Sequence, residues 1–124
     1  MVQTTKIFEL EQDGEIVIVV PQIDMGEFGY LELEKDAQVI LDQLAQSPPK
    51  HLVLDFHKTE YFGSTALSLF VRMWRLVSKN EGQMLLCSLS QAEQDILKST
   101  RLSQIWTVFP DRETTLQAVR EGAV

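Results

Sequence analysis

Residues 51–79 constrain the fold of this chain more than any other stretch. They begin with a short apolar run rich in branched side chains, His51–Phe56, which is typical of a buried strand. After a polar loop, apolar residues recur at intervals of three and four, as on the buried face of a helix: Leu67, Phe70, Val71, Trp74 and Val77. The opposite face would carry Arg72, Arg75 and Lys79. The stretch predicts a strand, a short loop and an amphipathic helix in succession.

The junction between loop and helix presents two hydroxyl groups. Gly63 gives the backbone freedom to turn. Ser64 is predicted to be the N-cap, because its oxygen can accept a hydrogen bond from a free N–H of the first turn. Thr65 would then be the first helical residue, beside the positive end of the helix dipole, where a phosphate group is favoured. From spacing alone, a Ser-Thr pair before a helix most often only caps it.

The segments on either side alternate between strands and helices. Before residue 51 we expect a strand at Ile7–Glu11, a turn at Gln12–Gly14, a strand at Glu15–Val20, a loop at Pro21–Tyr30 with Gly26 and Gly29, and a helix from about Leu31 to Ser47. After residue 79 we expect Gly82 as a left-handed C-cap, a strand at Gln83–Leu89, a helix capped by Ser90 and Glu93 that ends near Ser99, a strand at Thr107–Phe109, and a helix from Asp111 to Arg120.

This order predicts a fold class. Strands that alternate with helices form largely parallel sheets, and the first two strands add one antiparallel hairpin. We therefore expect a single α/β domain over residues 1–124, with its core at about residues 5–120 and about four helices. We expect Trp74 in the core and Trp106 partly exposed.

Charge and composition argue against several classes of function. The formal net charge is −7, whereas a nucleic-acid-binding protein needs basic residues to meet phosphates. No run of about 18 apolar residues could span a membrane, and Met1–Lys6 does not lead into the apolar core of a secretory signal. The single cysteine, Cys87, cannot form an internal disulfide. These features predict a cytoplasmic protein that binds neither nucleic acid nor membranes.

Signals for catalysis and for cofactors are weak. Asp55 and His57 precede Ser64, but the chain lacks the Gly-x-Ser-x-Gly elbow, and the spacing does not place the two side chains to orient one another. His51 and His57 have no matching carboxylates for a metal site. A phosphate-binding glycine loop is also missing. We therefore predict no catalytic residues, no metal and no cofactor.

Residues 55–68 resemble the signature of the STAS domain, the fold of the bacterial anti-sigma-factor antagonists. The family typically reads Asp-Leu-Ser-Gly, three or four mostly apolar residues, then Asp-Ser-Ser-Gly-Leu-Gly. This chain begins the signature with Asp55-Phe56 and ends it with Gly63-Ser64-Thr65-Ala66-Leu67-Ser68. Downstream, Asn80–Cys87 is similar to the family's Gly-Gly turn and next strand, and Lys98–Leu102 to its Leu-x-x-Thr-Gly-Leu segment. The resemblance extends over about residues 5–120.

The resemblance implies a regulatory protein rather than an enzyme. The unphosphorylated form would bind an anti-sigma factor, a serine/threonine kinase of the histidine-kinase-like ATPase type, and so free a sigma factor. The kinase would phosphorylate Thr65, with Ser64 as the second choice, and the phosphate would break the complex. The partner-binding residues implied are Asp55, His57, Phe62, Gly63, Ser64, Thr65, Ser68 and Arg72.

The chain departs from the family pattern at three positions. Gly63 replaces the aspartate that normally lies beside the phosphoacceptor, and Ala66 and Ser68 replace two glycines. Alanine and serine are better helix formers than glycine, so a stiffer helix start is expected. Gly63 favours an alternative in which the same surface serves a scaffold or adaptor without phosphorylation. A small-ligand-binding domain is a further alternative, which predicts saturable binding that depends on Ser64 or His57.

Overall fold

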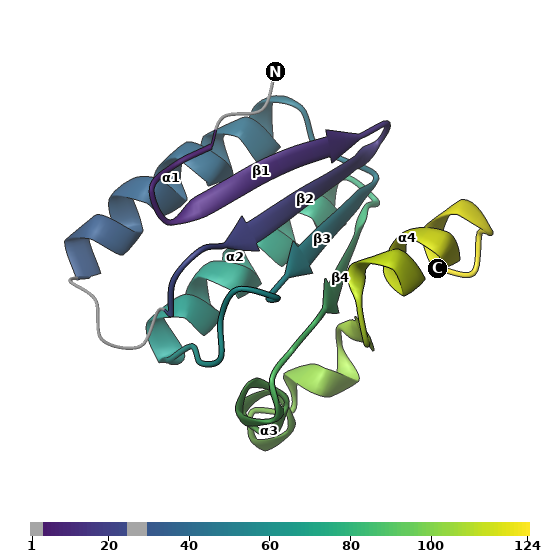
Figure 1. The fold of residues 1–124 in the computed structure, drawn as a ribbon. Helices are drawn as coiled ribbons and strands as arrows, with labels where there is room; N and C mark the ends of the chain where they lie inside the picture. Colours follow the sequence, from purple (N-terminus) through teal and green to yellow (C-terminus); the bar gives the residue numbers. More distant parts are fainter. Residues whose placement is uncertain (1–3, 25–29) are drawn as a thin grey trace.

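The computed structural model describes residues 4–24 and 30–124, and these form a five-stranded sheet in the order β1-β2-β3-β4-β5 (Figure 1). β1 (Phe8–Asp13) and β2 (Ile16–Pro21) pair antiparallel, while β3 (His51–Asp55), β4 (Gln83–Cys87) and β5 (Thr107–Phe109) extend the sheet in parallel. The α/β fold class predicted from the sequence is confirmed. Part of the expected loop, 25–29 with Gly26 and Gly29, lies outside the described residues.

The helices cover the two faces of the sheet unequally. α1 (Tyr30–Gln46) and α2 (Ser64–Lys79) lie side by side on one face, and the shorter α4 (Arg112–Arg120) lies on the other (Figure 1). α3 (Gln91–Ser99) follows β4, and a single 3₁₀ turn, η1 (Leu102–Gln104), connects it to β5. These are the helices within the described part of the chain, and the four α-helices match the sequence prediction.

Alternate side chains of the strands feed two separate apolar cores. The core under α1 and α2 takes, from the sheet, Phe8, Leu10, Val17, Val19, Leu52, Leu54, Met84 and Leu86. The core under α4 takes Ile16, Ile18, Val20, Val53, Leu85 and Cys87. Because both faces of β2 are covered, its sequence is apolar throughout and shows no alternation.

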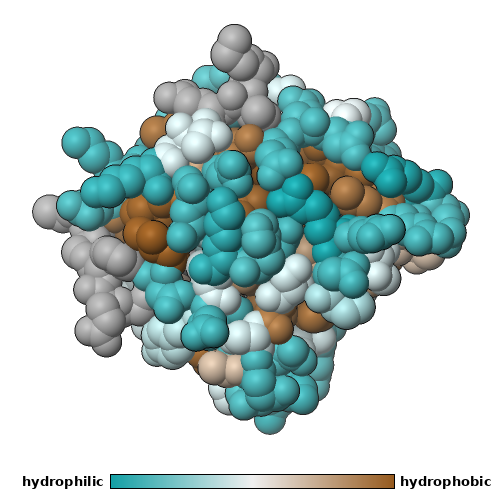
Figure 2. All heavy atoms as spheres, in the orientation of Figure 1, coloured by the Kyte–Doolittle hydropathy of each residue, from teal (hydrophilic) through white to brown (hydrophobic). Residues whose placement is uncertain are grey.

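Carboxylates on β1 hold cations from elsewhere in the chain. Glu9, Glu11 and Asp13 occupy alternate positions, opposite Val20, Ile18 and Ile16 of β2, so they share the α4 face. The following pairs form: Arg112 Nη1 to Glu11 Oε1 at 2.9 Å, Arg120 Nη2 to Asp13 Oδ2 at 2.8 Å, and Lys58 Nζ to Glu9 Oε1 at 3.5 Å. Hydrophilic side chains accordingly spread over much of the face that Figure 2 presents, with apolar residues visible between them.

The buried stripe of α2 differs from the expected one. Leu67, Phe70 and Val77 are buried as predicted, but Val71 and Trp74 are only partly buried, and the stripe is completed by Ala66, Leu69 and Met73. The helix is rotated about its axis relative to the predicted orientation, because it packs on the sheet and on α1 at once. Trp106 corrects a second expectation, since it is 2% exposed and stacks edge-on against Trp74 with ring centroids 6.5 Å apart.

In the turn after α2, the left-handed conformation belongs to a different residue from the one predicted from the sequence. Glu81, with φ 63°, is the left-handed residue, and Gly82 has an ordinary negative φ. A Cβ at Gly82 would lie 2.7 Å from the carbonyl oxygen of Pro49 and 2.9 Å from Cγ1 of Val77. Glycine is therefore needed for close approach and not for backbone freedom. β4 also ends at Cys87 rather than Leu89, because Ser88 adopts a left-handed conformation, φ 63°.

Candidate functional site

Asp55 ends β3 and holds the loop that follows. Its side chain is buried; Oδ1 accepts the backbone N–H of His57 at 3.1 Å and lies 3.1 Å from His57 Nδ1, while Oδ2 accepts Nε–H of Arg112 at 2.8 Å. Burial by itself would raise the pKa of Asp55, but hydrogen bonds from Arg112, Ser88 and His57 outweigh it and lower that pKa below its ordinary value. Asp55 is therefore a charged anchor beneath the loop.

The middle of the loop is fixed by α3 and by the segment after β2. Thr59 donates its hydroxyl to Oε2 of the fully buried Glu93 at 2.8 Å, and Ser90 donates its hydroxyl to the carbonyl of Glu60 at 2.7 Å. The backbone N–H of Glu60 in turn donates to Oδ1 of Asp24 at 2.8 Å. Burial raises the pKa of Glu93, although hydrogen bonds from Ser90 and Thr59 partly offset it. Two separate segments thus fix the path of the loop.

An aromatic cluster supports the start of α2 from below. Phe56, Phe62 and Phe70 are fully buried, and their ring centroids lie 5.3 to 5.4 Å apart in tilted and edge-to-face arrangements. Edge-to-face contacts of this kind add to the stabilisation from burial alone. This packing fixes Phe62, the residue just before Gly63, and leaves it little freedom to move.

The hydroxyls at the start of α2 are not used as a cap. Gly63 is the N-cap, with extended backbone (φ −103°, ψ −170°), and its carbonyl accepts the N–H of Leu67 at 3.1 Å. The helix thus begins one residue earlier than predicted, so that Ser64 is its first residue and Thr65 its second. Ser64 and Ser68 are exposed and Thr65 is partly exposed. Within the described residues, no hydrogen bond involves any of these three hydroxyls.

A shallow groove continues this surface along α2. It has a volume of about 460 Å³ and is lined by Leu67, Ser68, Val71, Arg72, Arg75, Thr100 and Leu102. Arg72 is held in place by α1, because its Nη1 donates to Glu34 Oε1 at 3.1 Å and to Oε2 at 3.3 Å. The site as a whole combines free hydroxyls, a strip of apolar side chains and guanidinium groups, which is suited to a protein partner.

Comparison with known families decides what kind of domain carries this site. The profile of the STAS domain family matches residues 8–115, which is nearly the whole chain. The chain belongs to the STAS domain family. The signature of the family, predicted at residues 55–68, lies in the loop after β3 and the first turns of α2.

Solved structures share the fold of this STAS domain at low sequence identity. A Thermotoga maritima protein, assigned provisionally as an anti-sigma factor antagonist, superposes with a TM-score of 0.80 and 17% identity, covering 93% of this chain and 96% of its own. An anti-sigma-factor antagonist (STAS) domain protein from Planctomyces limnophilus gives 0.74 and 21%, covering 90% and 96%. The anti-sigma factor antagonist SpoIIAA in its unphosphorylated form gives 0.75 and 19%, covering 94% and 98%.

Two further searches gave negative results. A search of curated proteins finds no significant match to this chain. None of the helices that the structure describes is long and apolar enough to cross a membrane.

The structure divides the eight predicted partner-binding residues of this STAS domain into two groups. Six of them, His57, Gly63, Ser64, Thr65, Ser68 and Arg72, are exposed or partly exposed along the loop and one side of α2. Asp55 and Phe62 are buried and can act only by supporting the others. The six residues with solvent access lie in the loop after β3 and in α2 up to Arg72, with buried residues such as Thr59 and Leu67 between them.

The catalytic alternative gains one contact but not a triad. Contrary to expectation, Asp55 and His57 do touch, because the carboxylate at the strand end folds over the next two residues and meets both the backbone and the ring of His57. No hydrogen bond connects His57 to Ser64 or Thr65 in the described structure. Among the described residues, no group of three or more His, Cys, Asp or Glu side chains is placed to hold a metal ion.

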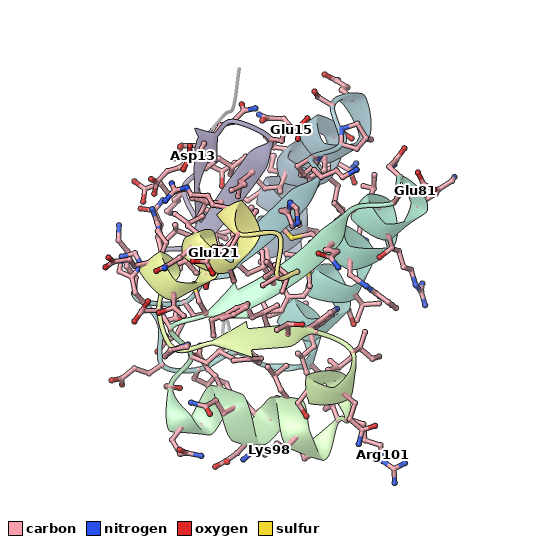
Figure 3. All side chains as sticks on the ribbon, turned by 90° about the vertical axis from the view of Figure 1, so that its right-hand side faces the viewer. Asp13, Glu15, Glu81, Lys98, Arg101 and Glu121 are labelled. Atoms are coloured by element: carbon pink, nitrogen blue, oxygen red, sulfur yellow. The ribbon has the colours of Figure 1, made fainter. Side chains whose placement is uncertain are left out.

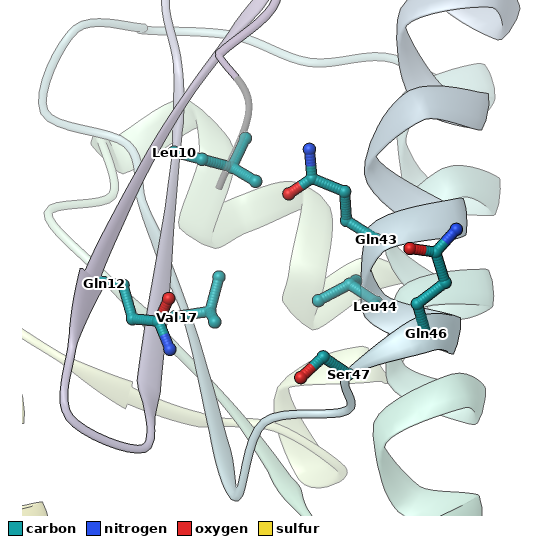
Figure 4. A pocket seen from close by; sticks show the side chains of 7 residues that line it. All are labelled: Leu10, Gln12, Val17, Gln43, Leu44, Gln46 and Ser47. Carbon is teal, nitrogen blue, oxygen red and sulfur yellow. The ribbon is translucent and has the colours of Figure 1, made fainter. Parts of the chain in front are cut away.

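A separate hollow at the far end of α1 offers packing but little chemistry. It measures about 190 Å³ and lies between the hairpin and α1, with Leu10, Val17 and Leu44 among its apolar lining (Figure 4). Its polar lining consists of the amides of Gln12, Gln43 and Gln46 and the hydroxyl of Ser47 (Figure 4). The hollow contains no ionisable side chain, and no residue of the STAS signature lines it.

Sequence reasoning missed the distant residues that position the loop. Arg112 and Glu93 lie 57 and 34 residues from their partners Asp55 and Thr59. One signal was available for Arg112. In a parallel sheet the carboxyl ends of the strands meet at one edge, so a cation just after β5 comes near a carboxylate at the end of β3.

Proposed function

We propose that this STAS domain is a regulatory protein-binding module rather than an enzyme. Its unphosphorylated form binds an anti-sigma factor, a serine/threonine kinase of the histidine-kinase-like ATPase type, and so frees a sigma factor in the cytoplasm. The contact surface is the exposed part of the loop after β3, the hydroxyls of Ser64, Thr65 and Ser68, and the groove beside Arg72. The observation that carries the proposal is that these hydroxyls, in the first two turns of α2, make no hydrogen bond within the described residues.

Phosphorylation of Thr65 is the proposed switch. The first N–H groups of α2 have no intrahelical acceptors, and the helix dipole adds positive potential there, so the folded domain can accommodate the phosphate. The modification adds roughly two negative charges. Thr65 has solvent access and lies on the proposed contact surface. A partner seated there would therefore contact both the charge and the bulk of the phosphate directly. The fold would survive phosphorylation, and the complex would not.

One observation favours a second function. The first turn of α2 contains no acidic residue, and Gly63 occupies the position of the family's aspartate. A kinase that recognises this carboxylate would not find it here. In this alternative the same surface serves a scaffold or adaptor that binds its partner regardless of phosphorylation.

A pull-down from the native host distinguishes the two functions. The baits are the wild type, Thr65→Ala, Thr65→Glu and, as a matched control for added charge, Ser78→Glu, an exposed serine near the far end of α2. We expect an ATPase-type anti-sigma factor with the wild type, Thr65→Ala and Ser78→Glu, but not with Thr65→Glu. Equal recovery by all four baits would refute the switch and support the scaffold.

A further inference from the structure

The two edges of the sheet are protected differently. The outer edge of β1 is occupied by the chain itself, since Phe8 N–H donates to Thr5 Oγ1 at 3.0 Å, and Leu10 N–H donates to Thr4 Oγ1 at 3.2 Å. β5 is the other edge strand and pairs only with β4. Apart from that pairing, no backbone group of Thr107–Phe109 makes a hydrogen bond within the described residues. An open strand edge of this kind can receive a further strand.

A groove runs beside the open edge, between β5 with η1 and α3. Its volume is about 380 Å³, and Leu89, Leu97 and Trp106 supply apolar surface to it. At its rim Ile105 is 51% exposed and Val108 is 39% exposed, an unusual degree for large apolar side chains. Trp106 also carries a buried indole N–H with no acceptor among the described residues. The exposed apolar rim is a feature that a ligand would cover.

The charge around the groove is opposite to that of the molecule. Lys98 is the only charged residue that lines the groove, and Arg101 follows α3 nearby, in a chain whose net charge is −7. Both are exposed, and neither forms an ion pair with a described carboxylate. Figure 3 shows Lys98 on α3 and Arg101 just after it, with the Arg101 side chain pointing outward, while the labelled acidic residues Asp13, Glu15, Glu81 and Glu121 lie away from this end.

We propose that the groove between β5 and α3 binds an extended segment of a partner protein in which apolar and acidic side chains alternate. The backbone of the segment would pair with the free edge of β5, which supplies affinity without regard to sequence. Alternate side chains of a strand point to opposite sides, so the apolar ones would enter the groove. The acidic ones would face the exposed ammonium group of Lys98 at the mouth of the groove. This site is distinct from the groove along α2, because the two grooves share no lining residue.

Two blocked octapeptides test the proposal, one of alternating valine and glutamate and one of alternating valine and lysine. Each is titrated into the full chain labelled with ¹⁵N, and amide and indole shifts are followed by NMR. We expect the acidic peptide to bind saturably and to shift the amides of Thr107–Phe109 and Lys98 and the indole N–H of Trp106. The basic peptide should bind about tenfold more weakly or not at all, because rim charges contribute modestly to affinity.

Charge reversal provides the matched variants. Lys98→Glu should weaken the acidic peptide about fivefold and strengthen the basic one, whereas Lys79→Glu, an exposed lysine at the end of α2, should change neither. Absence of saturable binding at millimolar peptide, or shifts confined to α2, would overturn the proposal. A concentration-dependent dimer in sedimentation experiments, with the β5 amides protected in the free protein, would overturn it in favour of a second copy of this chain.

Discussion

At the scale of single residues, the position of the helix cap decides what the site can do. Had Ser64 been the N-cap, its oxygen would have been committed to the backbone of the first turn. Gly63 takes that position with an extended backbone and no side chain, so the hydroxyls of Ser64 and Thr65 do not cap the helix and would be available to the proposed partner or kinase. The loop before them depends equally on single groups, above all on the buried carboxyl of Glu93.

Replacement of that carboxyl should change how stability depends on pH. Burial raises the pKa of Glu93 above its unfolded value, so the folded state binds more protons, and the contribution of Glu93 to stability is lost as the pH rises from the unfolded toward the folded pKa. Glu93→Gln removes this dependence while it keeps an acceptor for Ser90. Urea unfolding between pH 4 and 8 should show a smaller loss of stability with rising pH in the variant. An unchanged dependence of stability on pH in the variant would contradict a raised pKa of Glu93 in the folded state.

At the scale of elements, α4 is held to the sheet by two arginines whose ion pairs differ greatly in burial. Arg112, at the first turn, pairs with the buried Asp55 and with the partly exposed Glu11, whereas Arg120, at the last turn, pairs with Asp13 and both side chains are largely exposed. A buried carboxylate that loses its partner remains desolvated and unpaired, whereas an exposed pair contributes little. The first contact should therefore anchor the helix and the second should not.

The pair Arg112→Gln and Arg120→Gln tests this difference. Arg112→Gln should lower the free energy of unfolding by about 2 to 3 kcal/mol, because Asp55 stays buried and loses its cation. Arg120→Gln should change it by less than about 0.5 kcal/mol. Denaturant unfolding gives both values, and amide hydrogen exchange should show that α4 loses protection only in the first variant. Similar effects of the two variants on the free energy of unfolding would rule out Arg112 as the anchor of α4.

The turn after α2 gives a second test at this scale. Gly82→Ala should destabilise the protein by about 2 kcal/mol, because its Cβ would press on the carbonyl of Pro49 and on the side chain of Val77. Glu81→Gly, at the neighbouring left-handed residue, should be neutral or stabilising, since glycine adopts that conformation without strain. Thermal unfolding measures both. A neutral Gly82→Ala would show that the neighbouring backbone gives way easily.

Sequence reasoning recovers the elements of this fold better than the contacts between them. The strands at residues 51 and 107 and the capping box of Ser90 and Glu93 follow from local patterns that the structure reproduces. The cap at Gly63, the burial of Trp106 and the reach of Glu93 to Thr59 depend on where other elements pack. Local periodicity carries no information about such distances, which explains why the support beneath the candidate site was not predicted.

At the scale of the whole molecule, the candidate surfaces are separate from the groups that hold the fold together. The aromatic cluster, Asp55 and Glu93 lie beneath the loop, while the hydroxyls of α2 and the groove at β5 face outward. Variants on the outside should therefore alter binding without altering stability. Thr65→Glu should unfold within about 0.5 kcal/mol of the wild type, as is usual for a surface substitution, and circular dichroism melts can confirm this.

The most direct test of the central claim is the affinity of the anti-sigma factor recovered in the pull-down for two forms of this domain. One form is unphosphorylated and the other carries phosphothreonine at position 65, and each is titrated into the partner by calorimetry. The account predicts that the phosphate weakens binding on the order of a hundredfold, equivalent to about 3 kcal/mol. Equal affinities for the two forms would contradict the switch and leave a scaffold that binds through the same surface.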